Sequence, residues 1–512
     1  MFNNLKKHFG LLLLIAILVG GFAVRLYRFT GPIADWHSWR QADTSAVSRT
    51  FVEHGFDVLH PRFEDLSNVP SGLDNPEGYR FVEFPIYNVL QAALRVTFPV
   101  LTLEEWGRVV TILSSLGISL FLYLLLRRVV DEKTGIFAAF FYTFIPFSIY
   151  YGRTILPDTM MAMTILGGTY FFYLWIEGKT KINPSASLRA GDQNVKPLLK
   201  TQKYLIRSTL YFILATLFTA AAMLLKPYAL FFTLPMIWLA FDRFGLRFIK
   251  KWQLWLFLVL SVLPLALWRV WMAQYPSGIP VSAWLFNGGN IRFKGAYFYW
   301  LFADRIARLI LGYWGVSLLT AGALVVWGKQ YKKTAWLLLS FLLSSLLYMV
   351  VIARGNVQHD YYQILIVPSL VIFVALGGKF LFDPPEGVFP PVIGRLALLV
   401  LTLFMLFFGW YFIRDYFNIN NPAIVVAGQA VSQMTPSNAK IIAPYNGDTS
   451  FLYQTDRQGW ASFEKPLPEL IRMGADYLVL VNPRPEDRNI GKQYRIVSET
   501  PDYILFNLRQ KP

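Results

Sequence analysis

The chain has 512 residues, of which 55% are hydrophobic and 15% charged, and its formal net charge is +17. This composition is too apolar for a soluble globular protein of that length, so it indicates a polytopic membrane protein. The basic residues lie in short loops between apolar runs, where they indicate topology rather than a nucleic-acid-binding face. The absence of cysteine excludes disulfides, thiolate metal sites and a cysteine nucleophile.

About eleven apolar runs approach the roughly 20 residues that cross a membrane as a helix. The first run follows Lys6 and Lys7 and has only a weak cleavage site, so we interpret it as an uncleaved transmembrane helix. Lys226-Pro227 must form a tight connection between the fifth and sixth runs. The predicted spans are about 9–28, 107–126, 135–151, 159–176, 207–225, 228–241, 253–272, 306–327, 334–352, 361–381 and 394–413.

The loops between these runs differ in charge. If the N-terminus is cytoplasmic, the cytoplasmic loops are rich in Lys and Arg, whereas the short loops on the other side carry single cations, Arg153, Lys226 and Arg354. This asymmetry fits the positive-inside rule. It predicts a protein of the plasma or inner membrane, with the segment 29–106 and the C-terminus outside the cytoplasm. The cytoplasmic loop 178–206 is predicted to be flexible.

The segment 29–106 contains a dense polar stretch at residues 35–44. It brings two carboxylates, an imidazole, a guanidinium and two indoles together in ten residues. One interpretation is a solvated interfacial loop anchored by tryptophans. The other is an active-site loop, because ionisable groups beside a membrane are costly to bury. Amphipathic patterns at 44–54 and 86–98 predict helices on the membrane surface, and the aromatic-rich segment 273–305 is also predicted at an interface.

The sequence changes character beyond about residue 416. Helices are predicted at 424–434 and 467–473, and strands at 440–443, 477–481, 494–497 and 503–506. They indicate a small α/β domain of about 95 residues. The predicted fold is therefore a polytopic α-helical membrane protein, residues 1–415, followed by a small extracytoplasmic α/β domain, residues 416–512. Neither a nucleotide fingerprint nor an internal repeat is evident.

Polar outliers from five separate loops fall on the same predicted side of the membrane. Each has an ordinary explanation: Arg153 and Asp158 as an ion pair, Lys226 as a snorkelling side chain. Together they describe a site that binds an anion and needs a base, as a lipid-linked phosphate would require. The candidate residues are Asp35, His37, Arg40, Gln41, Asp43, Glu83, Arg153, Asp158, Lys226, Arg354, His359, Tyr361 and Tyr362.

Four short motifs carry a resemblance to a known family. They are His37-x-Trp39-Arg40-Gln41-x-Asp43-Thr44, Glu83-Phe84-Pro85-Ile86-Tyr87, Arg153-x4-Asp158 and His359-x-Tyr361-Tyr362. With the hydrophobic layout, they resemble the GT-C membrane glycosyltransferases over about residues 5–415. The nearest branch is that related to dolichyl-phosphate-mannose protein mannosyltransferases and bacterial aminoarabinose-lipid A transferases.

The resemblance implies inverting transfer of a hexose or pentose from a polyprenyl-phosphate donor to a lipid, glycan or protein acceptor of the cell envelope. An aspartate of the first outer loop would act as general base, and Lys or Arg would stabilise the leaving phosphate. No cofactor or metal ligand is assigned, and dependence on a divalent metal is not expected, although it stays open. The family's Asp-Glu pair is replaced by Arg40-Gln41, so either Asp43 or Asp35 must be the base. Asp43 would also cap a helix that begins at Thr44.

The second motif has Phe84 where the aminoarabinose transferases carry a lysine, so phosphate binding is assigned to Lys226, Arg153 or Arg354. Two other protein classes remain as alternatives. A transporter or flippase would place polar residues deep within broken spans, whereas these spans are nearly free of charge. A structural membrane protein with an outer interaction domain would not need the clustered loop residues.

Overall fold

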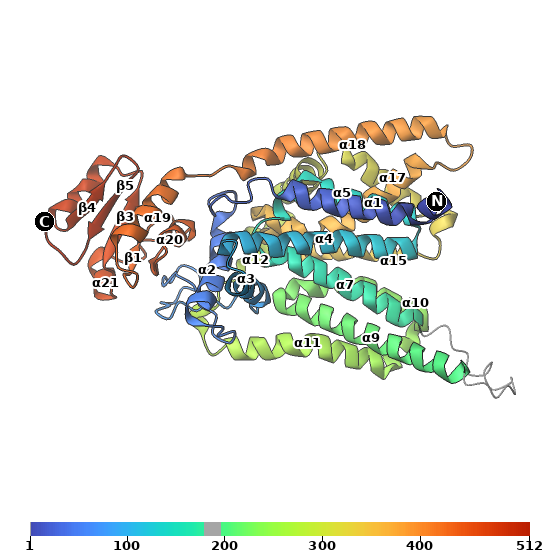
Figure 1. Cartoon of the computed structure of the whole chain (residues 1–512), viewed down its shortest axis with the longest axis horizontal. Helices are drawn as coiled ribbons and strands as arrows, with labels where there is room; N and C mark the ends of the chain where they lie inside the picture. Colours follow the sequence, from blue (N-terminus) through green and yellow to red (C-terminus); the bar gives the residue numbers. More distant parts are fainter. Residues whose placement is uncertain (1, 179–195) are drawn as a thin grey trace.

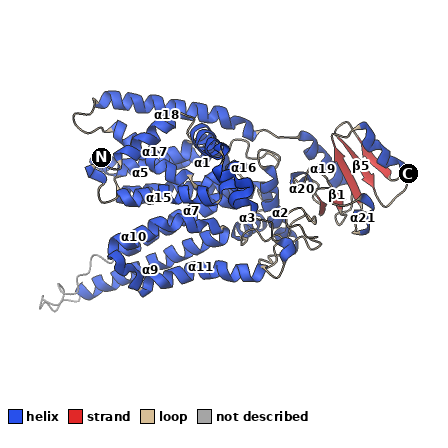
Figure 2. Ribbon diagram, turned by 180° about the vertical axis from the view of Figure 1, so that it is seen from behind, coloured by secondary structure: helices blue, strands red, loops and turns tan. Residues whose placement is uncertain are grey.

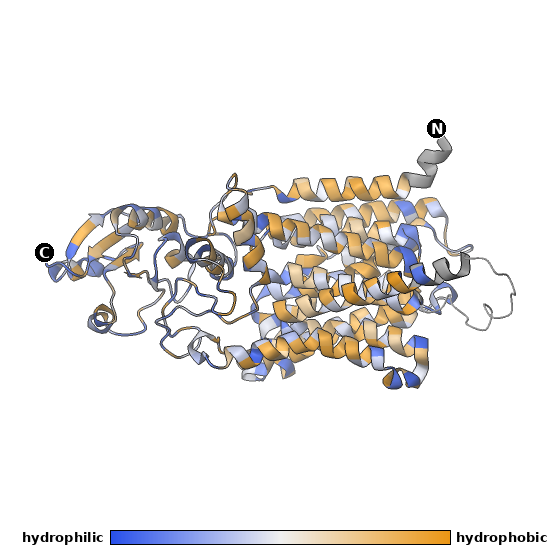
Figure 3. Cartoon of the chain, turned by 60° about the horizontal axis from the view of Figure 1, so that its bottom comes forward, coloured by the Kyte–Doolittle hydropathy of each residue, from blue (hydrophilic) through white to orange (hydrophobic). Residues whose placement is uncertain are grey.

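A computed structural model describes residues 2–178 and 196–512. Long helices form a bundle, and a small α/β domain lies beyond one end of it, as Figure 1 shows. The N-terminus lies at the opposite end of the bundle. Hydrophobic residues cover the helices of the bundle, whereas hydrophilic residues gather at the helix ends and in the C-terminal domain (Figure 3).

Within the described residues, six helices are long and apolar enough to cross a membrane, and a seventh span is possible if a pair bent by 110° is counted as one. The helices of the bundle are α1 (Phe2–Arg25), α4 (Leu103–Val129), α5 (Glu132–Phe144), α6 (Pro146–Tyr151), α7 (Pro157–Gly178), α9 (Lys196–Leu225), α10 (Leu234–Phe244), α11 (Trp252–Met272), α14 (Gly315–Val325), α15 (Ala335–Val351), α17 (Val367–Phe382) and α18 (Pro391–Ile413). Shorter helical segments link them: η1 (Pro227–Thr233), η2 (Gly245–Lys250), η3 (Pro276–Gly278), α12 (Trp284–Asn287), η4 (Gly288–Phe293), α13 (Gly295–Phe298), the π-helix η5 (Tyr299–Ile310), η6 (Lys329–Tyr331), α16 (Ala353–Gln358), η7 (Asp360–Leu365) and η8 (Arg414–Phe417).

The predicted apolar runs are helical, but the count of eleven spans stays a prediction. The run 135–151 is broken into α5 and α6 at Pro146, because proline lacks the N–H that would continue the helical ladder. The apolar parts of α1, α15 and α17 are shorter than a full span. Of the predicted loop 178–206, residues 179–195 lie outside the described residues, and 196–206 are already part of α9.

Close helix packing in the bundle depends on small residues. Gly322 of α14 faces α17, and a Cβ there would stand 1.8 Å from the carbonyl oxygen of Phe373. Gly377 is the reciprocal residue, 2.0 Å from the carbonyl oxygen of Leu318. Glycines allow two backbones to approach this closely, as they do in other membrane helix pairs.

The segment 29–106, here called the first loop, contains both predicted amphipathic helices, α2 (Ser38–His54) and α3 (Ile86–Thr97). The prediction that the first begins at Thr44 is wrong, because α2 begins six residues earlier, after His37 with a φ of 54°. Asp43 therefore lies inside the helix and cannot cap it. Most of α2 from Ser38 to Ser48 is buried, so it is an internal helix rather than one exposed on a membrane surface.

The C-terminal domain is a five-stranded mixed sheet with strand order β2-β1-β3-β5-β4 (Figure 2). The inner strands β1, β3 and β5 are apolar and buried, with helices packed on the sheet. The predicted helices and four strands are present, but the short β2 and α20 were missed. The elements are α19 (Pro422–Met434), β1 (Ile441–Ile442), α20 (Ser450–Gln454), β2 (Gly459–Trp460), α21 (Leu467–Arg472), β3 (Tyr477–Val481), η9 (Pro485–Lys492), β4 (Arg495–Glu499) and β5 (Tyr503–Asn507).

The first loop extends this sheet past β2. Asp65 pairs with Gly459 as a parallel bridge, and the amide of Leu66 donates to the carbonyl oxygen of Gly459 at 2.7 Å. Beside this contact, the Arg49 guanidinium lies 3.8 Å from the ring centre of Tyr453 and 2.9 Å from Glu64. The C-terminal domain is thus joined to the first loop by backbone pairing as well as by charged side chains.

Candidate active site

A cavity of about 450 Å³, here called the polar cavity because charged side chains stand on its otherwise largely apolar wall, lies where the first loop, the helix ends and the C-terminal domain meet. Six of the candidate residues line it: Arg40, Asp43, Lys226, His359, Tyr361 and Tyr362. The other lining residues are Trp39, Asp65, Val69, Pro70, Arg80, Phe81, Val82, Pro227, Tyr228, Arg269, Ile279, Pro280, Val281, Ser282, Trp284, Leu285, Phe286, Gly447 and Thr449. Segments distant in sequence therefore build one site.

Asp43 reaches the polar cavity from α2, on the helix face that it shares with Trp39 and Arg40, because residues three and four apart are neighbours on a helix. One carboxylate oxygen pairs with the Arg80 guanidinium. The other accepts a hydrogen bond of 2.6 Å from the Thr449 hydroxyl. Arg80 is positioned by its backbone, since its amide donates to the carbonyl oxygen of Pro61 at 2.8 Å.

One guanidinium nitrogen of Arg40, Nη2, donates to Glu83 and lies 2.7 and 2.9 Å from its two carboxylate oxygens. Both side chains are buried, and Arg40 also donates to the Thr44 hydroxyl at 3.2 Å. Such charge-assisted pairs fix the orientation of both groups. Glu83 does not line the polar cavity, and its contact with the cavity wall is this pairing with Arg40.

Lys226 stands where α9 ends, and its ammonium lies 2.8 Å from Asp158 in the first turn of α7. It also lies 5.9 Å from the ring centres of both Tyr361 and Tyr362. The second carboxylate oxygen of Asp158 is buried and accepts no hydrogen bond from the described residues. Lys226, Asp158 and the two tyrosines therefore lie together, although Asp158 itself does not line the polar cavity.

Arg269, near the C-terminal end of α11, was missed by the sequence analysis. It is exposed on the cavity wall. The other three cations of the wall, Arg40, Arg80 and Lys226, each pair with a carboxylate, whereas Arg269 forms no ion pair with the part of the chain that the structure describes. From the sequence it was an ordinary cation at the end of an apolar run.

Asp35 occupies a different environment from Asp43. Its carboxylate accepts from Arg153 at 2.8 Å and from Gln41 at 2.7 Å, and it is only 4% exposed. Gln41 in turn accepts from the amide of Ile155 at 3.1 Å. These residues join the first loop to the start of α7 and do not line the polar cavity.

His37 and the buried Asp360 form another cluster beside the polar cavity. The His37 Nε2 lies 2.7 Å from Asp360, which also accepts from the side chains of Trp36, Tyr151 and Tyr416. Burial alone would raise the pKa of Asp360, but the hydrogen bonds and charge of His37 hold it well below its usual range. Burial and the nearby His37 lower the pKa of His359 to about 4.

Arg354 is not brought to the polar cavity. Its guanidinium donates to the carbonyl oxygen of Gly288 at 3.4 Å. Asp65 does line the cavity, and burial raises its pKa to about 6 in spite of hydrogen bonds from Ser67.

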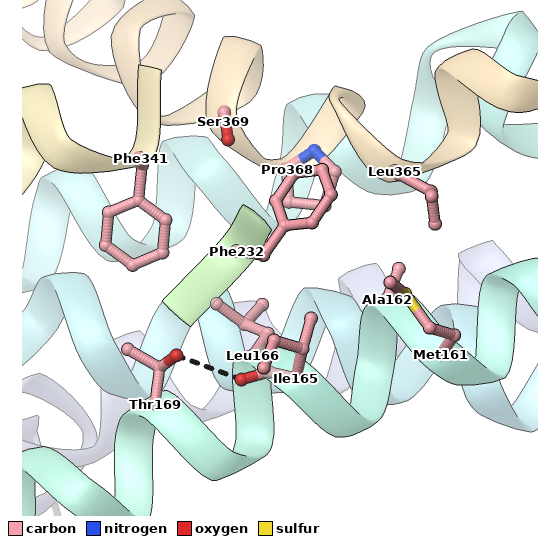
Figure 4. Close-up of a pocket in the computed structure, with 10 residues that line it drawn as sticks. All are labelled: Met161, Ala162, Ile165, Leu166, Thr169, Phe232, Phe341, Leu365, Pro368 and Ser369. Carbon is pink, nitrogen blue, oxygen red and sulfur yellow. Dashed lines mark hydrogen bonds between the residues drawn. The ribbon is translucent and has the colours of Figure 1, made fainter. Parts of the chain in front are cut away.

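Two apolar cavities lie within the bundle. Figure 4 shows the smaller, about 20 Å³, between Met161, Phe232, Phe341 and Leu365. The larger, about 360 Å³, is lined mainly by apolar residues of α7, α9, η1, α10, η2 and α11, several of which are exposed on the bundle surface. Neither offers charged groups, so the chemistry-bearing residues belong to the polar cavity.

Residues 90–186, which include α4 to α7, match the family model of dolichyl-phosphate-mannose-protein mannosyltransferases. No curated protein matches the chain. Its structure is similar to ArnT from Cupriavidus metallidurans bound to undecaprenyl phosphate, with a TM-score of 0.66, 11% identity and 98% of each chain covered.

A second similar structure is the archaeal oligosaccharyltransferase AglB from Archaeoglobus fulgidus, in complex with an inhibitory peptide and a dolichol-phosphate. Here the TM-score is 0.58 and the identity 11%, covering 93% of this chain and 70% of the archaeal one. The fold is thus that of the GT-C membrane glycosyltransferases, and the matched stretch relates it to the protein mannosyltransferases. This confirms the resemblance drawn from the motifs.

Proposed function

We propose that this protein transfers a sugar from a polyprenyl-phosphate-linked donor to a lipid, glycan or protein acceptor. The observation that carries the proposal is the polar cavity, which brings Lys226 and Arg269 at the helix ends together with Asp43 of the first loop. The GT-C fold supports it, because two proteins of similar structure bind undecaprenyl phosphate and dolichol-phosphate.

The donor phosphate would bind at Lys226 and Arg269. Both stand at the ends of apolar helices, where a lipid headgroup would lie beside its own tail. Because Arg269 has no carboxylate partner among the described residues, an incoming phosphate can pair with it without breaking an existing ion pair. The aromatic side chains of Tyr361 and Tyr362 would flank the phosphate or the sugar. Arg153 and Arg354, which the sequence analysis also proposed as phosphate ligands, do not line the cavity, and this makes Arg269 the stronger candidate.

Asp43 is the aspartate proposed as general base. It lines the cavity, whereas Asp35 is enclosed by Arg153 and Gln41. The acceptor hydroxyl oxygen attacks the anomeric carbon, and Asp43 takes its proton. The bond from that carbon to the phosphate oxygen breaks, its electron pair leaves with the polyprenyl phosphate, and the anomeric configuration inverts. A positioned base contributes about 10²–10⁴ in rate, and the cations stabilise charge that develops on the leaving phosphate.

The proposed location is the plasma or inner membrane, with the polar cavity and residues 416–512 outside the cytoplasm and residues 1–415 as the transferase domain. The distribution of basic residues supports this orientation, because the end of the bundle opposite the C-terminal domain carries the Lys- and Arg-rich loops.

Mass spectrometry of cell-envelope glycans and glycoproteins tests the proposal in cells with and without the gene. Deletion should remove one glycan modification, and the unaltered gene should restore it. The Asp43→Asn variant should fail to restore it although the protein accumulates normally. Identical glycans in the two strains would contradict the proposed function. Full restoration by Asp43→Asn would contradict the assignment of Asp43 as the base.

A further inference from the structure

The loop 445–449 of the C-terminal domain reaches into the polar cavity. Gly447 and Thr449 line it, although they lie about 400 positions after α2 in the chain. The Thr449 hydroxyl is 2.6 Å from Asp43 and 3.2 Å from the carbonyl oxygen of Trp39. A hydroxyl has one proton to donate, and a charged carboxylate is a stronger acceptor than a carbonyl oxygen. The Thr449 hydroxyl therefore donates to Asp43, with which it makes the shorter contact.

The shape of the loop fixes the position of Thr449. Asn446 and Gly447 both have positive φ, 55° and 78°, which only a few residue types adopt readily. Backbone bonds from Tyr445 and Gly447 to the carbonyl oxygen of Ala461 anchor the loop to the sheet. Asp448 then accepts from the amide of Ser450 at 2.8 Å at the start of α20.

The C-terminal domain itself is fixed by contacts outside the cavity. The bridge of Asp65 with Gly459 and the contact of Arg49 with Tyr453 join it to the first loop. A Cβ added to Gly447 would lie 3.1 Å from Val69, so the loop also packs directly on the cavity rim. Thr449 is therefore held against Asp43 by the domain and not by the hydrogen bond alone.

We propose that the C-terminal domain completes the active site by supplying Thr449 as a positioning residue for Asp43; this inference rests on the proposed function. Arg80 holds one carboxylate oxygen and Thr449 the other, which fixes the plane of the carboxylate. Without the hydroxyl, the group is held at one oxygen and can rotate away from the acceptor proton. Rate depends steeply on such alignment.

The experiment compares Thr449→Val, which keeps the β-branched shape without the hydroxyl, with Thr449→Ser, which keeps the hydroxyl. Ser437→Ala, at an exposed position of the same domain, is the control. Each purified protein is added to detergent-treated membranes of the deletion strain, which contain unused donor and acceptor. Mass spectrometry follows the product, and the donor supply is varied by adding lipid extract of the same strain.

Thr449→Val should lower the maximal rate by about 10-fold or more, the value of a hydrogen bond to a charged group. The amount of lipid extract that gives half the maximal rate should not change. Thr449→Ser should stay close to the unaltered protein, as should Ser437→Ala. If Thr449→Val does not fold, Thr449→Ala gives the same comparison with serine.

Two results would overturn the inference alone while the unaltered protein is active. One is full activity of Thr449→Val, and the other is an equal loss in Thr449→Ser, which would make the methyl group rather than the hydroxyl responsible. If the unaltered protein forms no product, the proposed function fails and this inference fails with it.

Discussion

Asp35 and Asp43 lie eight positions apart in the first loop. The groups around them are of the same kinds, but only Asp43 can be reached from the polar cavity. Each is buried, pairs with one arginine and accepts a hydrogen bond from one neutral side chain. Yet the partners of Asp35 enclose it, whereas Asp43 opens on the polar cavity. Charge pairing therefore does not distinguish a structural aspartate from a candidate base; access to a cavity does.

The largest expected effect is on transfer when Asp43 loses its basicity. Asp43→Asn should lower the rate by about 10²–10⁴ while the protein still folds, because the amide keeps the size of the carboxylate but not its proton affinity. Initial rates in membranes of the deletion strain measure this. A rate within a few-fold of the unaltered protein would move the base elsewhere.

The contrasting change is Asp35→Ala, which should affect folding. It leaves the Arg153 guanidinium buried without a carboxylate, a loss of about 3–5 kcal/mol of stability. Thermal unfolding of the purified protein measures it, with Asp57→Ala, at an exposed position, as the control. If Asp35→Ala unfolds at the same temperature as the control but has lost transfer, the contrast between the two aspartates is reversed.

Asp65, which also lines the polar cavity, should make the stability of the protein depend on pH. Its pKa is raised from 3.8 to about 6, mainly by burial. The folded protein thus holds this proton more tightly than the unfolded chain, and stability falls as pH rises from about 4 to 6, by about 3 kcal/mol from this group. Asp65→Asn should lose that part of the pH dependence, seen as a smaller difference in unfolding temperature between pH 4 and pH 7. Asp502→Asn, at an exposed position, is the control. If the difference in unfolding temperature between pH 4 and pH 7 is the same in Asp65→Asn as in this control and the unaltered protein, the raised pKa of Asp65 is contradicted.

The smallest expected effect concerns the phosphate. Arg269→Gln should weaken binding of undecaprenyl phosphate by about 10- to 100-fold, the range for a contact between charged partners. Arg354→Gln is the matched control, because its guanidinium contacts the carbonyl oxygen of Gly288 instead. Titration of the purified protein with the lipid measures both. Equal affinity for the lipid in Arg269→Gln and the unaltered protein would show that Arg269 does not bind the phosphate.

Much of the fold follows from periodicity, because apolar runs and alternating strands are local patterns. The strand at 477–481 and the helix at 424–434 were found this way. The start of α2 was not, since the polar stretch from Ser38 gives no amphipathic pattern and is buried through side-chain pairing. Without that start, the faces of the helix could not be assigned, and Asp35 could not be separated from Asp43.

The site was only partly predictable for a related reason. Lys226 was found because it is a single cation in a short predicted outer loop, and His359 because it belongs to the motif His359-x-Tyr361-Tyr362. Thr449 was not, because a threonine in a turn of a separate domain has no local feature that points to Asp43. Contacts between segments so distant in sequence are set by tertiary packing, which periodicity does not describe.

The pairing of residues 64–66 with β2 bears on how the protein is made. The first loop leaves the ribosome early, whereas Gly459 and the sheet around it come almost last. Contacts between such distant segments form late in folding. Residues 64–66 of the first loop therefore remain without their pairing partner, Gly459, through most of synthesis. A chain that stops before Gly459 would contain every helix of the bundle but lack the strand with which residues 64–66 pair, and on the proposed function we expect such a chain to be inactive.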